Sequence, residues 1–478
     1  MNKFIAFFVA IGNWFKRVGI AIGKWFKNWF VPVDGKAIIP VRIGRWVKSL
    51  FVRTDAVEEP RLKTLARSNG FKSVMSSVLC ILCGIIIGMI ILLVVGLVSK
   101  DVKSGDIVRG LLIILVGPLY TGSRARIEIG IDPFTIGNML LTATPLICTG
   151  LSVAIAFKTG LFNIGAPGQF LMGTMMSIIV ALGIPVTTPF GGFCVWLLAL
   201  LCGMLAGALW GAIPGLFKAL LGVNEVIVCI MTNWIAANIV SWVFSGSQFI
   251  NGDEGKTGYL YNTFHNNVST PRLLMDKIFP GSWADGGIII AILLAVVIFI
   301  ILNKTTFGFE LKACGSNRNA AKYAGMHDKR NIVLSMAIAG ALAGAGASLY
   351  YLNGNTEFYW NTYMSLPSEG FNGIPIALLA SSHPVGVIFA AIYMAFLTAG
   401  GGKLGNFTAF NSFIADLIIA VIIYFAGFSN LFRQILSGRK KKNAGGSGEN
   451  TDGNAPATIA PVTAETATDG QPAAAKEE

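Results

Sequence analysis

The chain contains a series of long apolar segments with almost no charged residues. A helix needs about 20 such residues to span the hydrocarbon core of a bilayer, or fewer where neighbouring helices cover its ends. The segments fall near residues 74–98, 138–157, 165–183, 190–212, 224–245, 286–303, 333–352, 371–381, 384–399 and 411–432. They predict an all-α, polytopic transmembrane helical bundle with about ten crossings, in which the short run 371–381 is a broken or half-helix.

Composition excludes the main alternatives to a membrane protein. Of the 478 residues, 54% are hydrophobic and 13% are charged, whereas soluble domains carry about 25% charged residues. A chain with so few charges cannot cover its apolar surface in water, so a soluble globular enzyme is excluded. A wholly disordered chain and a disulfide-stapled secreted domain are excluded by the same composition.

The positive charge is concentrated at the N-terminus. Residues 1–73 hold 14 of the 37 Lys and Arg residues but 4 of the 24 Asp and Glu residues. Repeated Trp-Phe-basic clusters in this segment predict an amphipathic helix at the membrane interface, where it meets anionic lipid headgroups rather than nucleic acid. A signal peptide and a spacer without a role in transport are the alternative interpretations.

The loops between the apolar segments set the predicted topology. Ten crossings place loop 304–332, with its six basic residues, on the cytoplasmic side together with both termini. The long loop 246–285, with three basic and four acidic residues, then lies outside. Beyond Lys442 the chain is rich in Gly, Ala, Thr and Pro, which predicts a disordered cytoplasmic tail. The predicted organisation is an interfacial segment, a transmembrane domain and a tail, at residues 1–73, 74–432 and 433–478.

The sequence contains no recognisable metal, cofactor or nucleotide site. Gly255, Lys256 and Thr257 resemble the end of a phosphate-binding loop, but Ile250 stands where that loop requires glycine. The three histidines are far apart in sequence, and none belongs to an HExxH motif. The glycine-rich run 339–346 is typical of close helix packing. We therefore expect no metal and no cofactor on this chain, so that ATP-driven transport would need a motor on another subunit.

Two carboxylates lie within the predicted spans. Asp416 falls in the last apolar segment, and Glu225 falls near the start of the fifth. A carboxylate at the bilayer centre costs on the order of 2.5–3.5 kcal/mol on insertion scales, so it should face the bundle interior or a wet cavity. A structural hydrogen bond to a neighbouring helix is the alternative for Asp416, and a contact at the helix N-terminus is the alternative for Glu225.

Two segments in different halves of the chain resemble each other. Residues 160–167 (GLFNIGAP) and 370–375 (GFNGIP) each place a Phe-Asn pair among glycines, with a proline shortly after. Gly/Pro-interrupted helices at matching places in two oppositely oriented halves are typical of the central site of a transporter. Asn amides and freed backbone groups there would hydrogen-bond a polar solute. Chance, or a shared packing requirement, would produce the same similarity.

The predicted inner loop contains the signals of a short helix. Asn317 is a suitable N-cap, the residues from Arg318 to Ala324 follow in helical register, and Gly325 ends the run. A short exposed helix with small apolar residues and basic flanks suits docking to a cytoplasmic protein. An ordinary amphipathic loop helix is the alternative.

The order of several motifs within residues 74–432 resembles a known family. The motifs lie at residues 143–154, 157–169, 222–227 and 306–325. Together they resemble the ribose/branched-chain amino-acid class of ABC importer permeases, and within that class the nucleoside (guanosine-type) permeases. The long N-terminal segment, the loop 246–285 and the tail depart from the family pattern and leave the substrate range open.

This resemblance implies a membrane-spanning permease subunit of an ATP-driven importer in the bacterial plasma (inner) membrane, not itself an enzyme. Its partners would be a second related permease, a cytoplasmic ATP-binding subunit, an extracytoplasmic solute-binding lipoprotein and the lipid bilayer. Closure of the ATPase would drive alternating access, and the solute would be a nucleoside. A simple-sugar or branched-chain amino-acid permease is the nearest alternative. A proton-coupled secondary transporter and a structural membrane subunit are the others.

The resemblance also implies roles for individual residues. The ATPase would dock on the short inner helix, at Asn317, Arg318, Ala321, Lys322 and Tyr323. A nucleoside pocket needs amides for base edges and ribose hydroxyls, and aromatic rings for stacking. The residues expected to line it are Asn163, Gln169, Asn233, Phe371 and Asn372.

Overall fold

The computed structural model describes residues 69–99, 102–124, 126–251, 254–257, 268–362, 364–428 and 431–432. The chain divides into two units, Met1–Met75 and Ser76–Glu478, and the fold given below is that of the second unit. Most of the predicted interfacial segment 1–73 and all of the predicted tail 433–478 lie outside the described residues.

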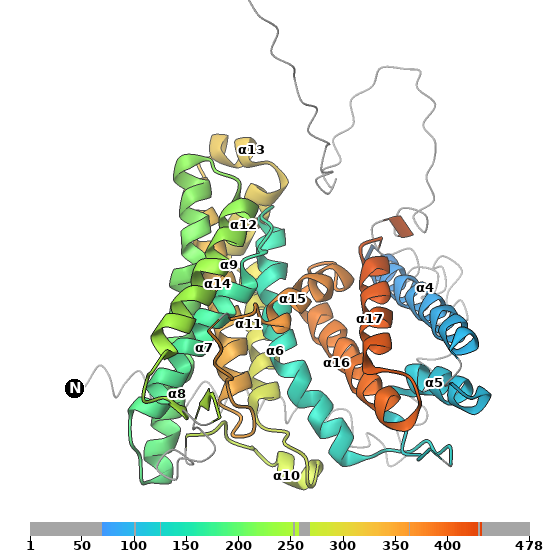
Figure 1. The fold of residues 1–478 in the computed structure, drawn as a ribbon. Helices are drawn as coiled ribbons and strands as arrows, with labels where there is room; N and C mark the ends of the chain where they lie inside the picture. Colours follow the sequence, from blue (N-terminus) through green and yellow to red (C-terminus); the bar gives the residue numbers. More distant parts are fainter. Residues whose placement is uncertain are drawn as a thin grey trace, which may run out of the picture. The chain divides into compact units, whose positions relative to one another are not determined.

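Helices form nearly all of the described regular structure (Figure 1). They are α4 (Asn69–Val98), α5 (Ser104–Val116), α6 (Pro133–Lys158), α7 (Ala166–Gly183), α8 (Pro189–Leu216), α9 (Glu225–Phe244), α10 (Met275–Ile278), α11 (Gly287–Lys304), α12 (Thr306–Ser316), α13 (Arg318–Tyr323), α14 (Asp328–Tyr351), α15 (Ser368–Leu379), α16 (Pro384–Phe407) and α17 (Ser412–Ala426). Shorter elements are a 3-10 turn (Gly117–Leu119), a π-helical turn (Phe217–Leu221) and the antiparallel strands β1 (Ile250–Asn251) and β2 (Lys256–Thr257).

Eight of the described helices are long and apolar enough to cross a membrane, namely α4, α6, α7, α8, α9, α11, α14 and α16. They coincide with eight of the ten predicted segments. The other two segments form shorter helices, α15 with 12 residues and α17 with 15 residues. The short helix expected at 371–381 is α15, and it is joined to α16 by a turn in which Ser381 and Ser382 have positive φ. The predicted all-α transmembrane bundle is confirmed, whereas its orientation stays a prediction.

Capping side chains explain where several helices begin. The carboxylate of Asp132 accepts hydrogen bonds from the backbone N–H groups of Phe134 and Thr135 at the start of α6. Thr188 caps α8 in the same way, and α8 opens with Pro189, which has no N–H group to satisfy. These signals lie within a few residues of each helix start.

The core of the bundle contains α6, α7 and α14. The span windows of these helices are 78%, 78% and 72% buried, whereas that of α4 is 22% buried. α14 packs along α8 backbone to backbone, because a Cβ at Gly340 would collide with the carbonyl oxygen of Gly207, and one at Gly344 with that of Gly203. The predicted packing role of the glycine-rich run 339–346 is therefore confirmed.

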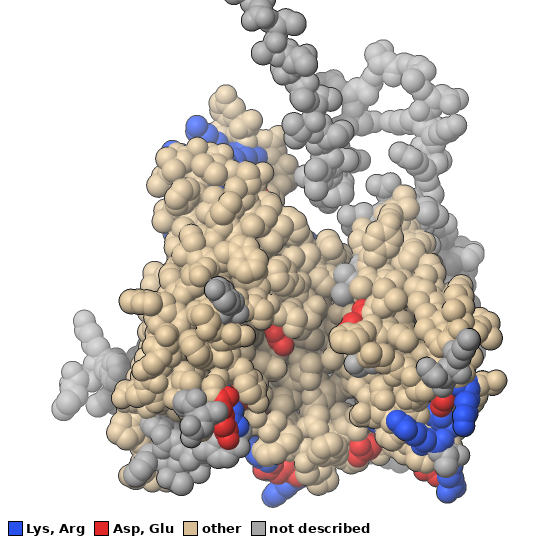
Figure 2. Space-filling view, in the orientation of Figure 1, with Lys and Arg blue, Asp and Glu red and all other residues tan. Residues whose placement is uncertain are grey.

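Charged side chains gather toward the two ends of the bundle on the face shown in Figure 2, and the band between them is nearly uncharged. Large apolar side chains are exposed on several of the long helices, including Ile86 on α4, Leu205 on α8 and Leu293 on α11. An apolar band between polar ends is the surface that a lipid bilayer requires.

Candidate functional site

The two Phe-Asn segments that resemble each other in sequence lie against each other in the structure. Gly370, in the first turn of α15, packs on the first turn of α7, since a Cβ at Gly370 would lie 2.5 Å from the Cα of Pro167. Gly373 packs on α6, where its Cβ would lie 2.6 Å from the carbonyl oxygen of Thr149. The N-termini of α7 and α15 therefore meet beside α6, the arrangement expected of interrupted helices at a transporter's central site.

The side-chain amides of Asn163 and Gln169, around the start of α7, are buried and hydrogen-bond to each other. Each donates to the other's carbonyl oxygen, at 2.9 and 3.0 Å. Asn163 also donates to Ser152 Oγ and accepts from the backbone N–H of Gly165, both at 3.1 Å. All four hydrogen-bonding positions of the Asn163 amide are thus used within the chain.

The third predicted amide, Asn233 on α9, is also buried and holds the same turn. It accepts from the backbone N–H of Gly168 at 2.9 Å and donates to the carbonyl of Ile164 at 3.0 Å. Asn163, Gln169 and Asn233 therefore fix the segment between α6 and α7 against α9. A direct contact with solute would first require some of these hydrogen bonds to break.

Phe371 and Asn372, the other two predicted pocket residues, are more accessible. Phe371 is 39% exposed and Asn372 is half-buried, and the Asn372 amide forms no hydrogen bond with another described residue. These two side chains remain available to a solute.

Sequence reasoning missed Glu369, which directly precedes the second Phe-Asn segment. It is half-buried in the first turn of α15, and its Oε2 accepts a hydrogen bond from Ser368 Oγ at 3.2 Å. Its carboxylate acts electrostatically on Tyr350 and Tyr351, at the end of α14. An acidic residue at the edge of a Gly/Pro-interrupted apolar segment was the available signal.

The two tyrosines belong to an aromatic cluster next to this carboxylate. The rings of Tyr350 and Tyr351 meet edge to face with centroids 5.0 Å apart, and the Phe170 ring on α7 lies 6.4 Å from each. Phe358 extends the cluster, 5.6 Å from Tyr351. Phe170 and Phe358 are buried, so only the half-buried rings of Tyr350 and Tyr351 offer accessible apolar surface in this cluster.

A hollow opens in the face of the molecule drawn in Figure 2, beside α15 and α17 as they lie in Figure 1. Acidic atoms are exposed on its walls. Asp416 on α17 is exposed and forms no hydrogen bond or ion pair with another described residue. The hydrogen bond to a neighbouring helix that was the alternative for Asp416 is therefore absent among the described residues. Glu225, by contrast, is buried at the first position of α9 and pairs with Lys218 (Nζ–Oε2 2.9 Å), which favours its structural interpretation.

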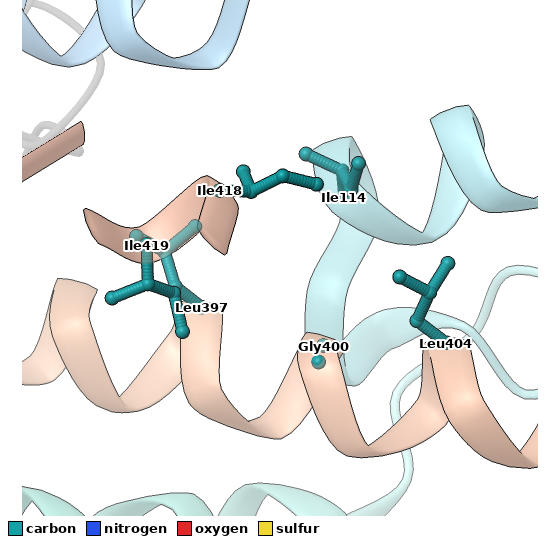
Figure 3. Close-up of a pocket in the computed structure, with 7 residues that line it drawn as sticks. Ile114, Leu397, Gly400, Leu404, Ile418 and Ile419 are labelled. Atoms are coloured by element: carbon teal, nitrogen blue, oxygen red, sulfur yellow. The ribbon is translucent and has the colours of Figure 1, made fainter. Parts of the chain in front are cut away.

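A second cavity lies between α5, α16 and α17 (Figure 3). It measures about 20 Å³ and is lined by the aliphatic and glycine residues Ile114, Leu397, Gly400, Gly401, Leu404, Ile418 and Ile419. A space of this size holds about one water molecule, and none of these side chains would hydrogen-bond it. We therefore exclude this cavity as a solute site.

The short helix predicted after Asn317 is present as α13, whereas its docking role stays a prediction. Asn317 caps it by accepting a hydrogen bond from the backbone N–H of Ala320 at 3.0 Å, and Gly325, with φ of 80°, ends it. Tyr323 is 94% exposed, and Asn317 and Lys322 are also exposed. Ala321 is 3% exposed and faces inward, so its side chain does not lie on the docking surface, contrary to expectation.

Arg318 connects α13 to the next helix. Its Nε donates to Asp328 Oδ2, at the start of α14, at 2.8 Å. A surface pocket of about 570 Å³ lies beside this ion pair and is lined by Lys322 and residues 325–330. A partner docked on α13 would therefore also reach the first turn of α14.

Comparisons with known proteins place these features in a family. The family model for the "branched-chain amino acid transport system / permease component" matches residues 135–426. The guanosine ABC transporter permease protein of Bacillus subtilis is 38% identical over 313 residues, which are 65% of this chain and 86% of that protein. The nucleoside ABC transporter permease protein of Lactococcus lactis is 37% identical over 61% of this chain and 78% of its own length.

A more distant relative is the glucose ABC transporter permease protein of Haloferax volcanii, which is 29% identical over 67% of this chain and 87% of its own length. The family model covers well over half of the chain. The chain therefore belongs to the branched-chain amino acid transport system permease-component family and is a membrane-spanning ABC transporter permease.

Proposed function

We propose that this chain imports nucleosides as a membrane subunit of an ATP-driven importer. The observation that carries the proposal is the contact of Gly370 with Pro167, which brings the starts of α7 and α15 together. Phe170, in the same part of α7, contacts the rings of Tyr350 and Tyr351. A nucleoside suits this place, because its base offers a flat face for stacking and its edge and ribose offer hydrogen-bonding groups. The identities of 38% and 37% to a guanosine and a nucleoside permease support the same substrate class.

The proposed machine draws its energy from other subunits. A cytoplasmic ATPase docks on α13 through Asn317, Lys322 and Tyr323, and its closure moves α14 through the Arg318–Asp328 ion pair. A second related permease and an extracytoplasmic solute-binding lipoprotein complete the importer in a bacterial plasma membrane. Residues 1–73 lie on the inner lipid surface, residues 74–432 form the permease, and residues 433–478 form a cytoplasmic tail.

Residues of the site have two kinds of role. Phe371 and Asn372 contact the solute. Asn163, Gln169 and Asn233 hold the turn before α7 in place, so that the start of α7 keeps its position beside Phe371 and Asn372. The site opens alternately to the two sides of the membrane as α14 and α15 change their relative position.

Uptake in native cells tests this function. Cells deleted for this chain and complemented with it are given labelled guanosine, uridine or glucose, with and without the companion ATPase. We expect ATPase-dependent uptake of nucleosides that survives collapse of the proton gradient. Uptake that persists without the ATPase but stops when the proton gradient is collapsed would instead assign a secondary transporter, with Asp416 as the first residue to test.

A simple sugar is the second candidate solute. The 29% identity to a glucose permease supports it, and ribose hydroxyls and sugar hydroxyls make similar hydrogen bonds. Glucose uptake without nucleoside uptake in the same cells would replace the nucleoside assignment.

A further inference from the structure

Glu369 is a half-buried carboxylate that the described residues leave largely unsatisfied. Its hydrogen bond with a described residue comes from its neighbour Ser368, and it forms no ion pair with any described side chain. It stands on α15, which packs on α6 around Thr149 and Gly150, away from both ends of that helix. A carboxylate at such depth is costly and indicates a functional site by default.

The surroundings of Glu369 restrict what it can bind. The half-buried Tyr350 and Tyr351 lie within its electrostatic reach, and the buried Phe170 ring packs against both of them. A planar ligand that stacks on this cluster would present its edge, rather than its face, to the carboxylate. The ligand's edge therefore needs hydrogen-bond donors, since an ionised carboxylate only accepts.

The edges of the common bases differ in the donors that they offer. Guanine carries the N1–H and the 2-amino group side by side, a pair that matches the two oxygens of a carboxylate as the fork of an arginine does. Hypoxanthine has the N1–H without the amino group. Adenine has an acceptor at N1 beside its single amino group, so it cannot make the paired contact.

We propose that Glu369 recognises the base of guanine-type nucleosides, with its carboxylate accepting hydrogen bonds from N1–H and the 2-amino group while the ring stacks on the tyrosine cluster. This inference rests on the proposed nucleoside function and adds to it a residue and a base edge. The same geometry gives inosine one of the two hydrogen bonds and adenosine neither, so the site ranks guanosine above inosine above adenosine.

Equilibrium binding to the purified permease–ATPase complex, without the lipoprotein, tests the proposal, because the lipoprotein's own specificity is then removed. Labelled guanosine, inosine and adenosine are compared on the native complex and on Glu369→Gln, Glu369→Asp and Asp416→Asn. The last variant is the matched control, since it removes one negative charge from a different membrane helix. Membrane abundance and co-purification of the ATPase show whether each variant is assembled.

We expect Glu369→Gln to weaken guanosine binding about ten- to hundredfold and to weaken inosine binding less. Adenosine binding should not weaken, because a glutamine amide can pair with the N1 acceptor and the 6-amino donor of adenine. Glu369→Asp should retain part of the guanosine preference, and Asp416→Asn should retain all of it. Equal losses for all three nucleosides would overturn the base contact, as would unchanged guanosine binding in an assembled Glu369→Gln complex. Failure of native cells to take up any nucleoside would instead overturn the proposed function.

Discussion

Replacement of Gly370 by alanine tests whether the two interrupted helices must touch. The added Cβ would lie 2.5 Å from the Cα and 2.7 Å from the nitrogen of Pro167, whereas non-bonded carbons rest about 3.5–4.0 Å apart. The obstructing atoms are backbone, and Asn233 holds the neighbouring Gly168 in place. The helix starts must therefore separate by about 1 Å, and overpacking of this kind costs about 1–3 kcal/mol.

That cost corresponds to a change of roughly 5- to 150-fold in the population of the closely packed state. We expect Gly370→Ala to lower the unfolding temperature of the purified complex and to reduce guanosine uptake per assembled transporter. Gly402→Ala on α16 is the control, because nothing lies within 4 Å of its added Cβ and alanine favours a helix by up to about 1 kcal/mol. If the two variants match each other in stability and uptake, the contact does not constrain the site.

Three further predictions concern docking, the amides and pH. Tyr323→Asp should abolish co-purification of the ATPase at normal membrane abundance, whereas Ala321→Asp should lower abundance itself because that side chain is buried. Asn163→Ala should also lower abundance, since its loss leaves buried polar groups unpaired at about 1–3 kcal/mol each, while Asn372→Ala should reduce uptake and spare abundance. Burial raises the pKa of the Asp285 carboxyl from 3.8 to about 7. The folded protein then holds this proton more tightly than the unfolded chain, so stability measured by thermal unfolding should fall as pH rises from about 4 to about 7, and Asp285→Asn should remove that slope.

The sequence predicts best what depends on neighbouring residues. The helix α13 follows the expected pattern because its cap at Asn317 and its stop at Gly325 lie at its own two ends. The packing role of run 339–346 follows from the sequence because small residues four apart let membrane helices approach each other closely. Apolar length likewise placed the membrane helices, with α15 and α17 shorter than the rest.

Properties that depend on distant contacts were not accessible from the sequence. Whether Asn163 faces a solute or another amide depends on where the fold brings Gln169, because two hydrogen bonds with Gln169 use one donor and one acceptor of the Asn163 amide. The inward direction of Ala321 likewise depends on the packing of α13 against its neighbours. Glu369 lies just before the apolar run, and only the fold shows that its carboxylate is half-buried.

The uninterrupted length of α14 has a mechanical consequence. This helix of 24 residues begins at the Arg318–Asp328 pair and ends at Tyr350 and Tyr351, a distance of about 36 Å at 1.5 Å per residue. At Gly340 and Gly344 its backbone lies directly against the backbone of α8, at Gly207 and Gly203. We expect the two helices to act as one stiff lever, so that a push near α13 reaches the tyrosines undiminished and bending is left to the turns around Gly160 and Ser381.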